Sequence, residues 1–177
     1  MKQGSRHFIL FVFVASLWLA TCSRADMADQ NAVITTSPEP AGELPLQMLD
    51  GTSGDLADYR GQVVLVNFWA TWCAPCRIEM PELDSYYQAH QDDGFVLLAI
   101  NAGEVRARAA EYLTENNYTF PILLDEDGVA ADYFGGLRGM PTSFVLDQTG
   151  EVTYQHVGIL TTADLDAHVT PLLQSQQ

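Results

Sequence analysis

A pentapeptide with two cysteines, WCAPC at residues 72–76, constrains this chain more than any other feature. It follows an apolar run at residues 63–69, which is typical of a buried strand, and precedes a helix-like stretch at residues 77–90. Cys73 would therefore lie at a helix N-terminus, where unpaired backbone N–H groups and the helix dipole favour a thiolate. A thiolate is the attacking species in disulfide exchange, so the pentapeptide predicts a redox-active dithiol formed by Cys73 and Cys76.

The cysteine count indicates a single pair and not a disulfide framework. The chain has three cysteines, and the third, Cys22, lies near the N-terminus. A lone pair can also be a structural disulfide. The tryptophan before the pair, the proline inside it and the strand-to-helix position favour the redox interpretation.

The N-terminal residues have the pattern of an export signal. Lys2, Arg6 and His7 form a basic start, and the apolar or small residues 8–20 follow. This run is shorter than the roughly 20 residues that a bilayer-spanning helix needs, but it suits the apolar region of a signal peptide. We therefore expect residues 1–25 to be a signal peptide or a lipoprotein signal.

Two processing routes fit this segment. Residues 23–25 (SRA) form a small-x-small site that would allow cleavage before Asp26. Residues 19–22 (LATC) resemble a bacterial lipobox, in which Cys22 would be lipidated, although Thr21 departs from the usual Gly, Ala or Ser. An uncleaved signal anchor is a third alternative. The membrane is therefore expected as a partner only through an N-terminal anchor.

Composition changes after the signal segment. Residues 26–43 are polar and without periodicity, which predicts a flexible linker, and residues 44–177 are expected to form one folded domain. All 23 acidic residues lie at or after Asp26, and the net charge of the whole chain is −15. A surface of this sign repels phosphate backbones, so we expect no nucleic-acid partner. Such a surface is typical of a soluble protein, of a protein adapted to a salty medium, or of a protein that attracts a basic partner.

Strand and helix patterns alternate along the expected domain. The predicted order is a short hairpin before residue 56, strand 63–69, helix 75–90, strand 95–100, helix 104–116, strand 120–124, short helix 129–134, strands 143–146 and 151–156, and helix 162–174. This order predicts an α/β fold in which helices cover both faces of a central mixed β-sheet.

Four motifs in this domain give a family resemblance. They are residues 67–76 (NFWATWCAPC), 79–81 (EMP), 133–135 (YFG) and 138–142 (RGMPT). With these motifs, residues 44–174 resemble thioredoxin-fold proteins, and more narrowly the exported TlpA/ResA-type thiol–disulfide oxidoreductases. The resemblance implies a thioredoxin fold with an N-terminal β extension and an inserted helix and strand between Glu104 and Leu124.

The resemblance implies roles for the residues of the dithiol. Cys73 would be the exposed nucleophile, and Cys76 the buried thiol that resolves the mixed disulfide. Glu79 would share a helix face with Cys76 and exchange a proton with it, whereas an exposed Glu that complements the helix dipole is the alternative. Asn67 stands where cytoplasmic thioredoxins have a buried Asp, so the acid that handles protons would lie elsewhere or be absent.

The resemblance also implies a substrate-binding surface around the dithiol. Pro141 corresponds to the family's cis-proline, and the cis bond would expose the backbone of Met140 for strand-like pairing with a substrate peptide. Thr142, which follows in this turn, would also contact the substrate. Trp72 and Pro75 would contact the substrate beside the sulfurs.

Together these expectations describe an exported reductase of client-protein disulfides, placed in the periplasm or at the outer face of the bacterial inner membrane. In the resembling subfamily the clients include apocytochrome c and copper-site proteins, and a membrane thiol–disulfide protein would supply the electrons. No cofactor and no resident metal are expected, because the four histidines lack metal-ligand spacing with the cysteines. The alternatives are a module that binds copper or zinc through the dithiol, and a disulfide-forming oxidant.

Overall fold

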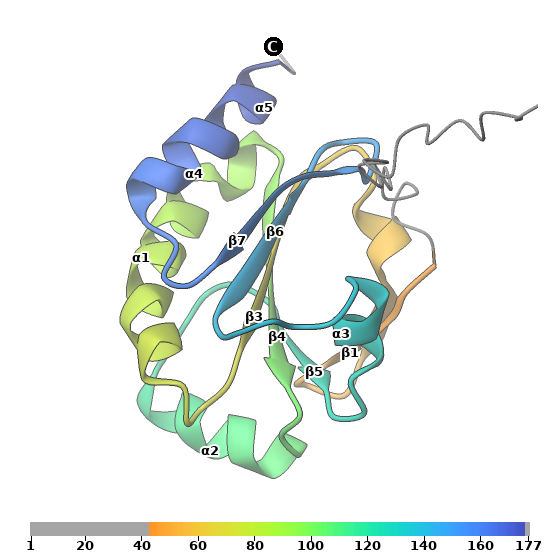
Figure 1. The fold of residues 1–177 in the computed structure, drawn as a ribbon, viewed down its shortest axis with the longest axis vertical. Coiled ribbons are helices and arrows are strands. Elements are labelled where there is room, and N and C mark those ends of the chain that lie inside the picture. Colours follow the sequence, from red (N-terminus) through yellow and green to blue (C-terminus); the bar gives the residue numbers. More distant parts are fainter. Residues whose placement is uncertain (1–42, 176–177) are drawn as a thin grey trace, which may run out of the picture. The chain divides into compact units, whose positions relative to one another are not determined.

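The computed structural model describes residues 43–175 of the chain (Figure 1). The predicted signal segment with Cys22, and residues 26–42 of the predicted linker, lie outside the described residues. Within residues 43–175, none of the helices is both long and apolar enough to span a membrane.

A seven-stranded mixed sheet forms the centre of the described chain. Its strands are β1 (Pro45–Met48), β2 (Ser53–Asp55), β3 (Val63–Trp69), β4 (Phe95–Ala102), β5 (Ile122–Asp125), β6 (Thr142–Leu146) and β7 (Val152–Val157). Their order across the sheet is β2-β1-β5-β4-β3-β6-β7. β3, β4 and β5 are parallel because a helix crosses over between each pair, and the remaining pairs are antiparallel.

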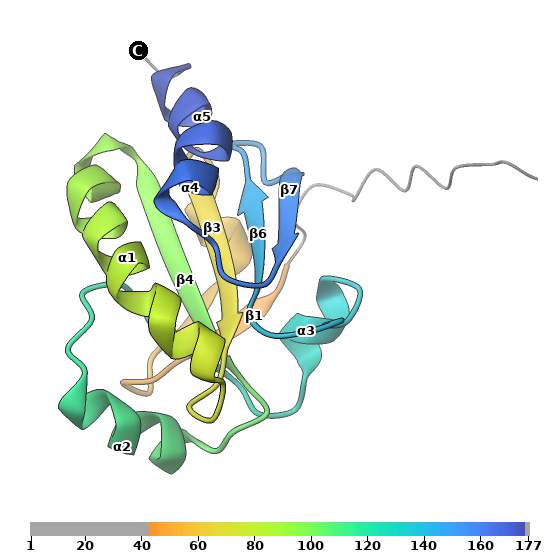
Figure 2. The same ribbon diagram turned by 60° about the vertical axis from the view of Figure 1, so that its left-hand side comes forward.

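Helices cover both faces of this sheet (Figures 1 and 2). They are α1 (Ala74–His90), α2 (Arg106–Glu115), α3 (Val129–Tyr133), α4 (Thr162–His168) and α5 (Thr170–Gln174), with the short 3₁₀ helices η1 (Leu56–Tyr59) and η2 (Gln91–Asp93). α1 and α4 lie on one face of the sheet, and α3 lies on the other (Figure 2). The predicted thioredoxin fold is confirmed: the hairpin β1–β2 is the N-terminal extension, and α2 with β5 is the inserted pair.

β3 separates two apolar cores. Its side chains alternate between the faces, so that Leu65 and Trp69 join the cluster beneath α1 and α4, while Val66 and Phe68 join the cluster on the opposite face. All seven residues of the strand are buried. Burial on both faces explains the continuous apolar run, because neither face of the strand meets water. This strand ends two residues before the pentapeptide that contains the cysteines.

The predicted C-terminal helix, residues 162–174, is two short helices. α4 ends at His168 and α5 begins at Thr170, so the helix is interrupted at Val169. Pro171 gives the physical reason, because proline has no N–H to donate to the carbonyl four residues earlier. The packing stripe survives the interruption, since the buried residues of both helices join the core beneath α1.

Candidate active site at the start of helix α1

The two cysteines of the pentapeptide lie at the first turn of α1. Cys73 is the N-cap, and its Sγ accepts a hydrogen bond from the backbone N–H of Cys76 at 3.2 Å. Pro75 stands in the first turn, where its missing N–H costs the helix nothing. The sulfurs of Cys73 and Cys76 form a disulfide, with their Cα atoms 5.3 Å apart. The predicted pairing of these cysteines across one helical turn is therefore confirmed.

Cys73 is less exposed than the resemblance implied. Cys73 is 3% exposed and Cys76 is fully buried, whereas the neighbouring Trp72 is 66% exposed. The expectation of an exposed Cys73 is wrong for this disulfide-bonded form. The N-cap geometry turns its side chain back over the helix, and the bond to a buried sulfur keeps it there. A reaction partner therefore has to approach a sulfur that lies just beneath the surface.

The turn before β6 has the predicted cis bond, between Met140 and Pro141. Met140 is partly buried and packs against the core cluster that contains both cysteines. Thr142 is fully buried, and its hydroxyl donates to the carbonyl of Gly139 at 2.8 Å. Its side chain therefore holds the turn and does not reach the surface, so burial argues against the predicted contact between Thr142 and a substrate.

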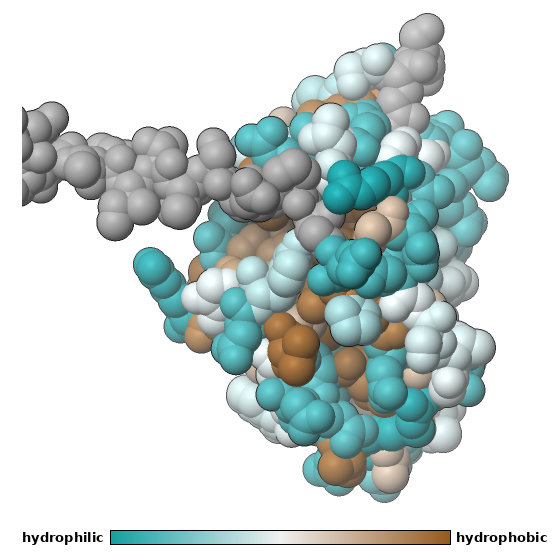
Figure 3. Space-filling model, turned by 90° about the vertical axis from the view of Figure 1, so that its right-hand side faces the viewer, coloured by the Kyte–Doolittle hydropathy of each residue, from teal (hydrophilic) through white to brown (hydrophobic). Residues whose placement is uncertain are grey.

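Exposed apolar side chains lie near the dithiol in the sequence and beside this turn. Trp72 and Ile78 are each 66% exposed, and Val157 and Ile159 are also exposed. The residue between Val157 and Ile159 donates its N–H to the carbonyl of Pro141 at 2.9 Å, so these two side chains flank the proline turn. Apolar side chains also reach the surface among polar ones on the face of the molecule that carries α3 and β1 (Figure 3).

Glu79 lies one helical turn beyond Cys76 and is fully buried. Its Oε1 accepts a hydrogen bond from Asn67 Nδ2 at 2.7 Å, and its Oε2 accepts one from the backbone N–H of Leu160 at 2.8 Å. Asn67 Nδ2 also donates to Ser143 Oγ at 3.0 Å. The carboxyl group therefore lies inside the protein on the Cys76 side of α1, and the alternative of an exposed, dipole-complementing Glu is wrong.

Burial dominates the electrostatics of Glu79. It raises the pKa of the carboxyl group to about 7, although the hydrogen bonds from Leu160 and Asn67 favour the charged form. The charge of Glu82, further along α1, raises the pKa in the same direction as burial. A carboxyl group with a pKa near neutrality can both accept and return a proton under ordinary conditions.

One feature of the sequence indicates this polar network. Asn67 interrupts an otherwise apolar buried strand, and a buried polar side chain requires a hydrogen-bond partner. Its partners come from β6, through Ser143, and from α1, through Glu79. No sequence pattern indicates the third contributor, the backbone N–H of Leu160, because it depends on how the segment before α4 packs against α1.

A second carboxylate, Glu104, fixes the loop between β3 and α1. Its two oxygens accept hydrogen bonds from Thr71 N at 2.7 Å and Thr71 Oγ1 at 2.6 Å, and Asn101 Nδ2 donates to it at 2.9 Å. Burial opposes ionisation of Glu104, but these hydrogen bonds outweigh it, and the pKa lies below its ordinary value. Glu104 precedes the inserted helix α2, so the insertion is attached directly to the loop that presents Trp72 and Cys73.

We expect Glu104→Ala to lower the free energy of unfolding by about 1–2 kcal/mol, since hydrogen bonds to a charged group are lost and the site is partly open to solvent. Urea unfolding followed by circular dichroism measures the change. Glu111→Ala is the matched control, because within residues 43–175 the side chain of Glu111 forms only an exposed pair with Arg108 at 3.5 Å. Equal stabilities of the two variants would contradict a stabilising role for the hydrogen bonds between Glu104 and the loop before α1.

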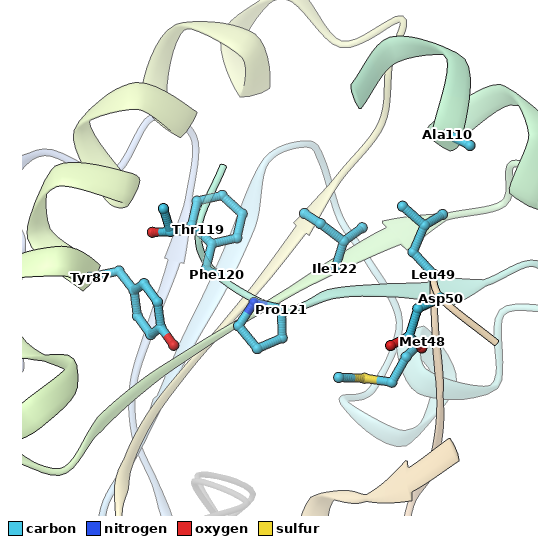
Figure 4. Close-up of a pocket in the computed structure, with 9 residues that line it drawn as sticks. All are labelled: Met48, Leu49, Asp50, Tyr87, Ala110, Thr119, Phe120, Pro121 and Ile122. Atoms are coloured by element: carbon cyan, nitrogen blue, oxygen red, sulfur yellow. The ribbon is translucent and has the colours of Figure 1, made fainter. Parts of the chain in front are cut away.

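A groove elsewhere along α1 is separate from this site (Figure 4). It has a volume of about 600 Å³ and is lined by Tyr87 of α1, Ala110 of α2, residues 119–122 around the start of β5 and residues 48–50 after β1. Tyr87 lies three turns beyond Cys76, about 16 Å along the helix axis. None of the predicted site residues lines the groove. Among residues 43–175 there is also no group of three or more His, Cys, Asp or Glu side chains that could hold a metal ion.

Comparisons with known proteins show the family of this chain. The pattern of the AhpC/TSA family matches residues 38–155. The chain belongs to this family. Thiol-disulfide oxidoreductase ResA of Geobacillus thermodenitrificans is 34% identical to it over 165 residues, which are 93% of this chain and 92% of the relative. The chain is therefore a ResA-like thiol–disulfide oxidoreductase, and its substrates contain disulfides.

Solved structures of the same class share the fold. A thiol:disulfide interchange protein of the thioredoxin family from Chlorobium tepidum is 31% identical, with a TM-score of 0.67 over 77% of this chain and 97% of its own. A secreted thiol-disulfide isomerase from Corynebacterium glutamicum is 29% identical, with a TM-score of 0.70 over 76% of this chain and 85% of its own.

Proposed function

We propose that this chain is an exported reductase of protein disulfides that acts through Cys73 and Cys76, with Glu79 as the proton partner of Cys76. One observation supports the role of Glu79 in this proposal above the others. Glu79 is a buried carboxyl group, one helical turn from Cys76, whose pKa lies near neutrality. A base beside the resolving thiol assists the step that releases a reduced substrate.

The first step joins the chain to its substrate. The Cys73 thiolate attacks one sulfur of a substrate disulfide, so that a bond between Cys73 Sγ and that sulfur forms while the substrate's own S–S bond breaks. The other substrate sulfur leaves as a thiolate and takes a proton from solvent. The position of Cys73 as N-cap of α1 stabilises its thiolate, because the helix N-terminus offers unpaired N–H groups and a positive dipole end.

The second step releases the substrate. Cys76 gives its proton to Glu79 and attacks Cys73 Sγ, which forms the Cys73–Cys76 disulfide and expels the second substrate sulfur as a thiolate. The substrate has then gained two electrons and the chain has lost two. The sulfurs already lie within one helical turn, so the attack is intramolecular and fast compared with a reaction between separate molecules. An external dithiol, which we place on a membrane thiol–disulfide protein, must return two electrons before the next cycle.

Substrate binding is assigned to the surface around the dithiol. The backbone of Met140 before cis-Pro141 would pair with an extended substrate segment, while Trp72 and Pro75 would contact the same segment beside the sulfurs. Both Trp72 and Pro75 are exposed, as this role requires. Thr142 has no direct part in this proposal because its side chain is buried.

We place this reaction outside the cytoplasm. The basic and apolar N-terminal residues have the form of an export signal, cleaved before Asp26 or lipidated at Cys22. The secreted neighbour from Corynebacterium glutamicum is consistent with export. Disulfides persist in such compartments, and the clients would be exported proteins such as cytochrome c precursors, whose haem-attachment cysteines must be reduced.

Mixed-disulfide capture tests the proposal. Cys76→Ser keeps the attacking thiol but removes the resolving one, so we expect it to accumulate adducts with exported proteins that dissolve on reduction. Cys73→Ser is the matched control and should form none. Alkylation of free thiols in intact cells, read as a mass shift, then tests the direction: a reductase is held mainly in the dithiol form. A mainly oxidised pair would indicate the disulfide-forming alternative, and equal adduct levels in the two variants would contradict the assignment of Cys73.

A further inference from the structure

Asn67 is buried in β3 between Glu79 and Ser143, two hydrogen-bond partners that can each act as donor or acceptor. Its Nδ2 donates to Glu79 Oε1 at 2.7 Å and to Ser143 Oγ at 3.0 Å. Its Oδ1 is buried and has no hydrogen-bond partner within residues 43–175. An unpaired buried acceptor costs free energy, so this atom requires an explanation.

The two oxygens of Glu79 differ in the hydrogen bonds that they can form. Oε2 accepts from the backbone N–H of Leu160, which can only donate. When the carboxyl group takes up a proton, Oε2 must remain an acceptor toward Leu160, and the side that faces Asn67 can change. A carboxamide can follow such a change, because a half-turn of the group exchanges its NH₂ donor for its oxygen acceptor. The hydroxyl of Ser143 can likewise reverse from acceptor to donor.

We propose that Asn67 is a positioning residue that keeps Glu79 hydrogen-bonded in both of its protonation states by turning its carboxamide. Nδ2 donates to the carboxylate, and Oδ1 accepts from the carboxylic acid. The unpaired Oδ1 is the atom that this rotation brings to Glu79, and Ser143 reverses its hydroxyl in the same movement. The inference rests on the proposed role of Glu79 as the proton partner of Cys76.

Among the described neighbours of Glu79, Asn67 is the side chain that can both donate a hydrogen bond to its carboxyl group and accept one from it. On α1 the groups that can carry charge near Glu79 are Cys76, one turn before it, and Glu82, which acts through its charge. β3, β6 and the segment before α4 contribute Asn67, Ser143 and the backbone of Leu160, all of them neutral. An Asp in place of Asn67 would itself titrate, and two carboxyl groups at hydrogen-bond distance share one proton and titrate as a pair.

The first test measures the carboxyl group directly, without reference to activity. Carbon-13 NMR of the Glu side chains in the disulfide-bonded full chain gives the titration of Glu79, assigned by its loss in Glu79→Gln. We expect Asn67→Leu to raise the pKa of Glu79 by about one unit, because the ionised form loses a charge-assisted hydrogen bond. Asn67→Asp should titrate in two steps, the upper one above the wild-type value. Asn117→Leu, at an exposed position, is the matched control. An unchanged titration in Asn67→Leu would overturn the inference.

The second test follows the wild-type chain, and variants serve only to assign its signals and as a control. The side-chain NH₂ signals of Asn67, assigned by their loss in Asn67→Leu or Asn67→Ser, should shift with the same midpoint as Glu79, and should be independent of pH across this range in Glu79→Gln. Signals that stay constant while Glu79 titrates would show that the carboxamide does not turn. If both tests give the expected shifts but the rate of disulfide reduction does not follow the pKa of Glu79, the proposed function of Glu79 fails and the role of Asn67 stands.

Discussion

Replacing Cys73 by Ser is expected to lower the rate of disulfide reduction by about 1000-fold or more, since the reaction then has no nucleophile that a substrate can reach. A serine hydroxyl is not ionised at neutral pH and cannot form the mixed disulfide. The remaining thiol, Cys76, is fully buried, so it cannot replace Cys73 from beneath the surface. Reduction of insulin disulfides by the purified chain, with an excess of small dithiol as electron source, measures the loss.

The chain offers a matched Cys→Ser control. Cys22→Ser changes a cysteine outside the pentapeptide, and the reductase rate of the purified protein should not change. Retention of more than a tenth of the wild-type rate by Cys73→Ser would mean that Cys76 reacts with substrates directly. Attack would then have to occur through local opening of the first turn of α1, and the order of the two thiols in the proposed cycle would be wrong.

The second large effect concerns stability as a function of pH. Glu79 has a pKa of about 7 in the folded chain because it is buried, whereas the ordinary value is 4.5. Between these two values the unfolded chain loses the proton and the folded chain keeps it, so stability falls as pH rises. Below pH 4.5 the contribution is fully present, and above pH 7 it is lost. We expect Glu79→Gln to gain about 3 kcal/mol relative to wild type between pH 4 and pH 8, at about 1.4 kcal/mol per unit of pKa.

Urea unfolding of both proteins at a series of pH values measures this difference. Glu82→Gln is a control of opposite sign. Hydrogen bonds from the side chain and backbone of Thr162 lower the pKa of Glu82, so its ionised form favours the fold, and that variant should lose stability relative to wild type as pH rises. A stability difference between Glu79→Gln and wild type that does not vary between pH 4 and pH 8 would mean that the carboxyl group ionises as easily inside the protein as in water.

The elements around the dithiol were predictable because their signals are local. The apolar run at residues 63–69 is β3 without a change of bounds, and the helix after the cysteines is α1 with its N-cap at Cys73. The cis bond before Pro141 was predictable only through the family resemblance, since an isolated X–Pro pair is usually trans. Periodicity and capping therefore predict where a helix or strand begins, while the resemblance supplied the geometry of a turn.

The predictions failed where tertiary contacts determine the burial or the hydrogen-bond partner of a side chain. Cys73 is nearly buried because its side chain turns back over the helix, and Thr142 is buried because the turn before β6 uses its hydroxyl. Glu104 hydrogen-bonds Thr71 from 33 residues away, and no spacing rule connects them. Pro171 indicates the interruption of the helix at Val169, but the continuous apolar stripe predicted a single helix.

The hydrogen bond between Glu79 and Leu160 joins residues that are 81 positions apart. During synthesis both cysteines and Glu79 therefore emerge long before the segment that completes the carboxyl site. A partial chain has its two thiols beside a carboxyl group that lacks its backbone donor and the cover of α4. In the proposed cycle the dithiol therefore acquires its proton partner only when the last helices dock onto α1. Its full reactivity would appear only once the fold is complete.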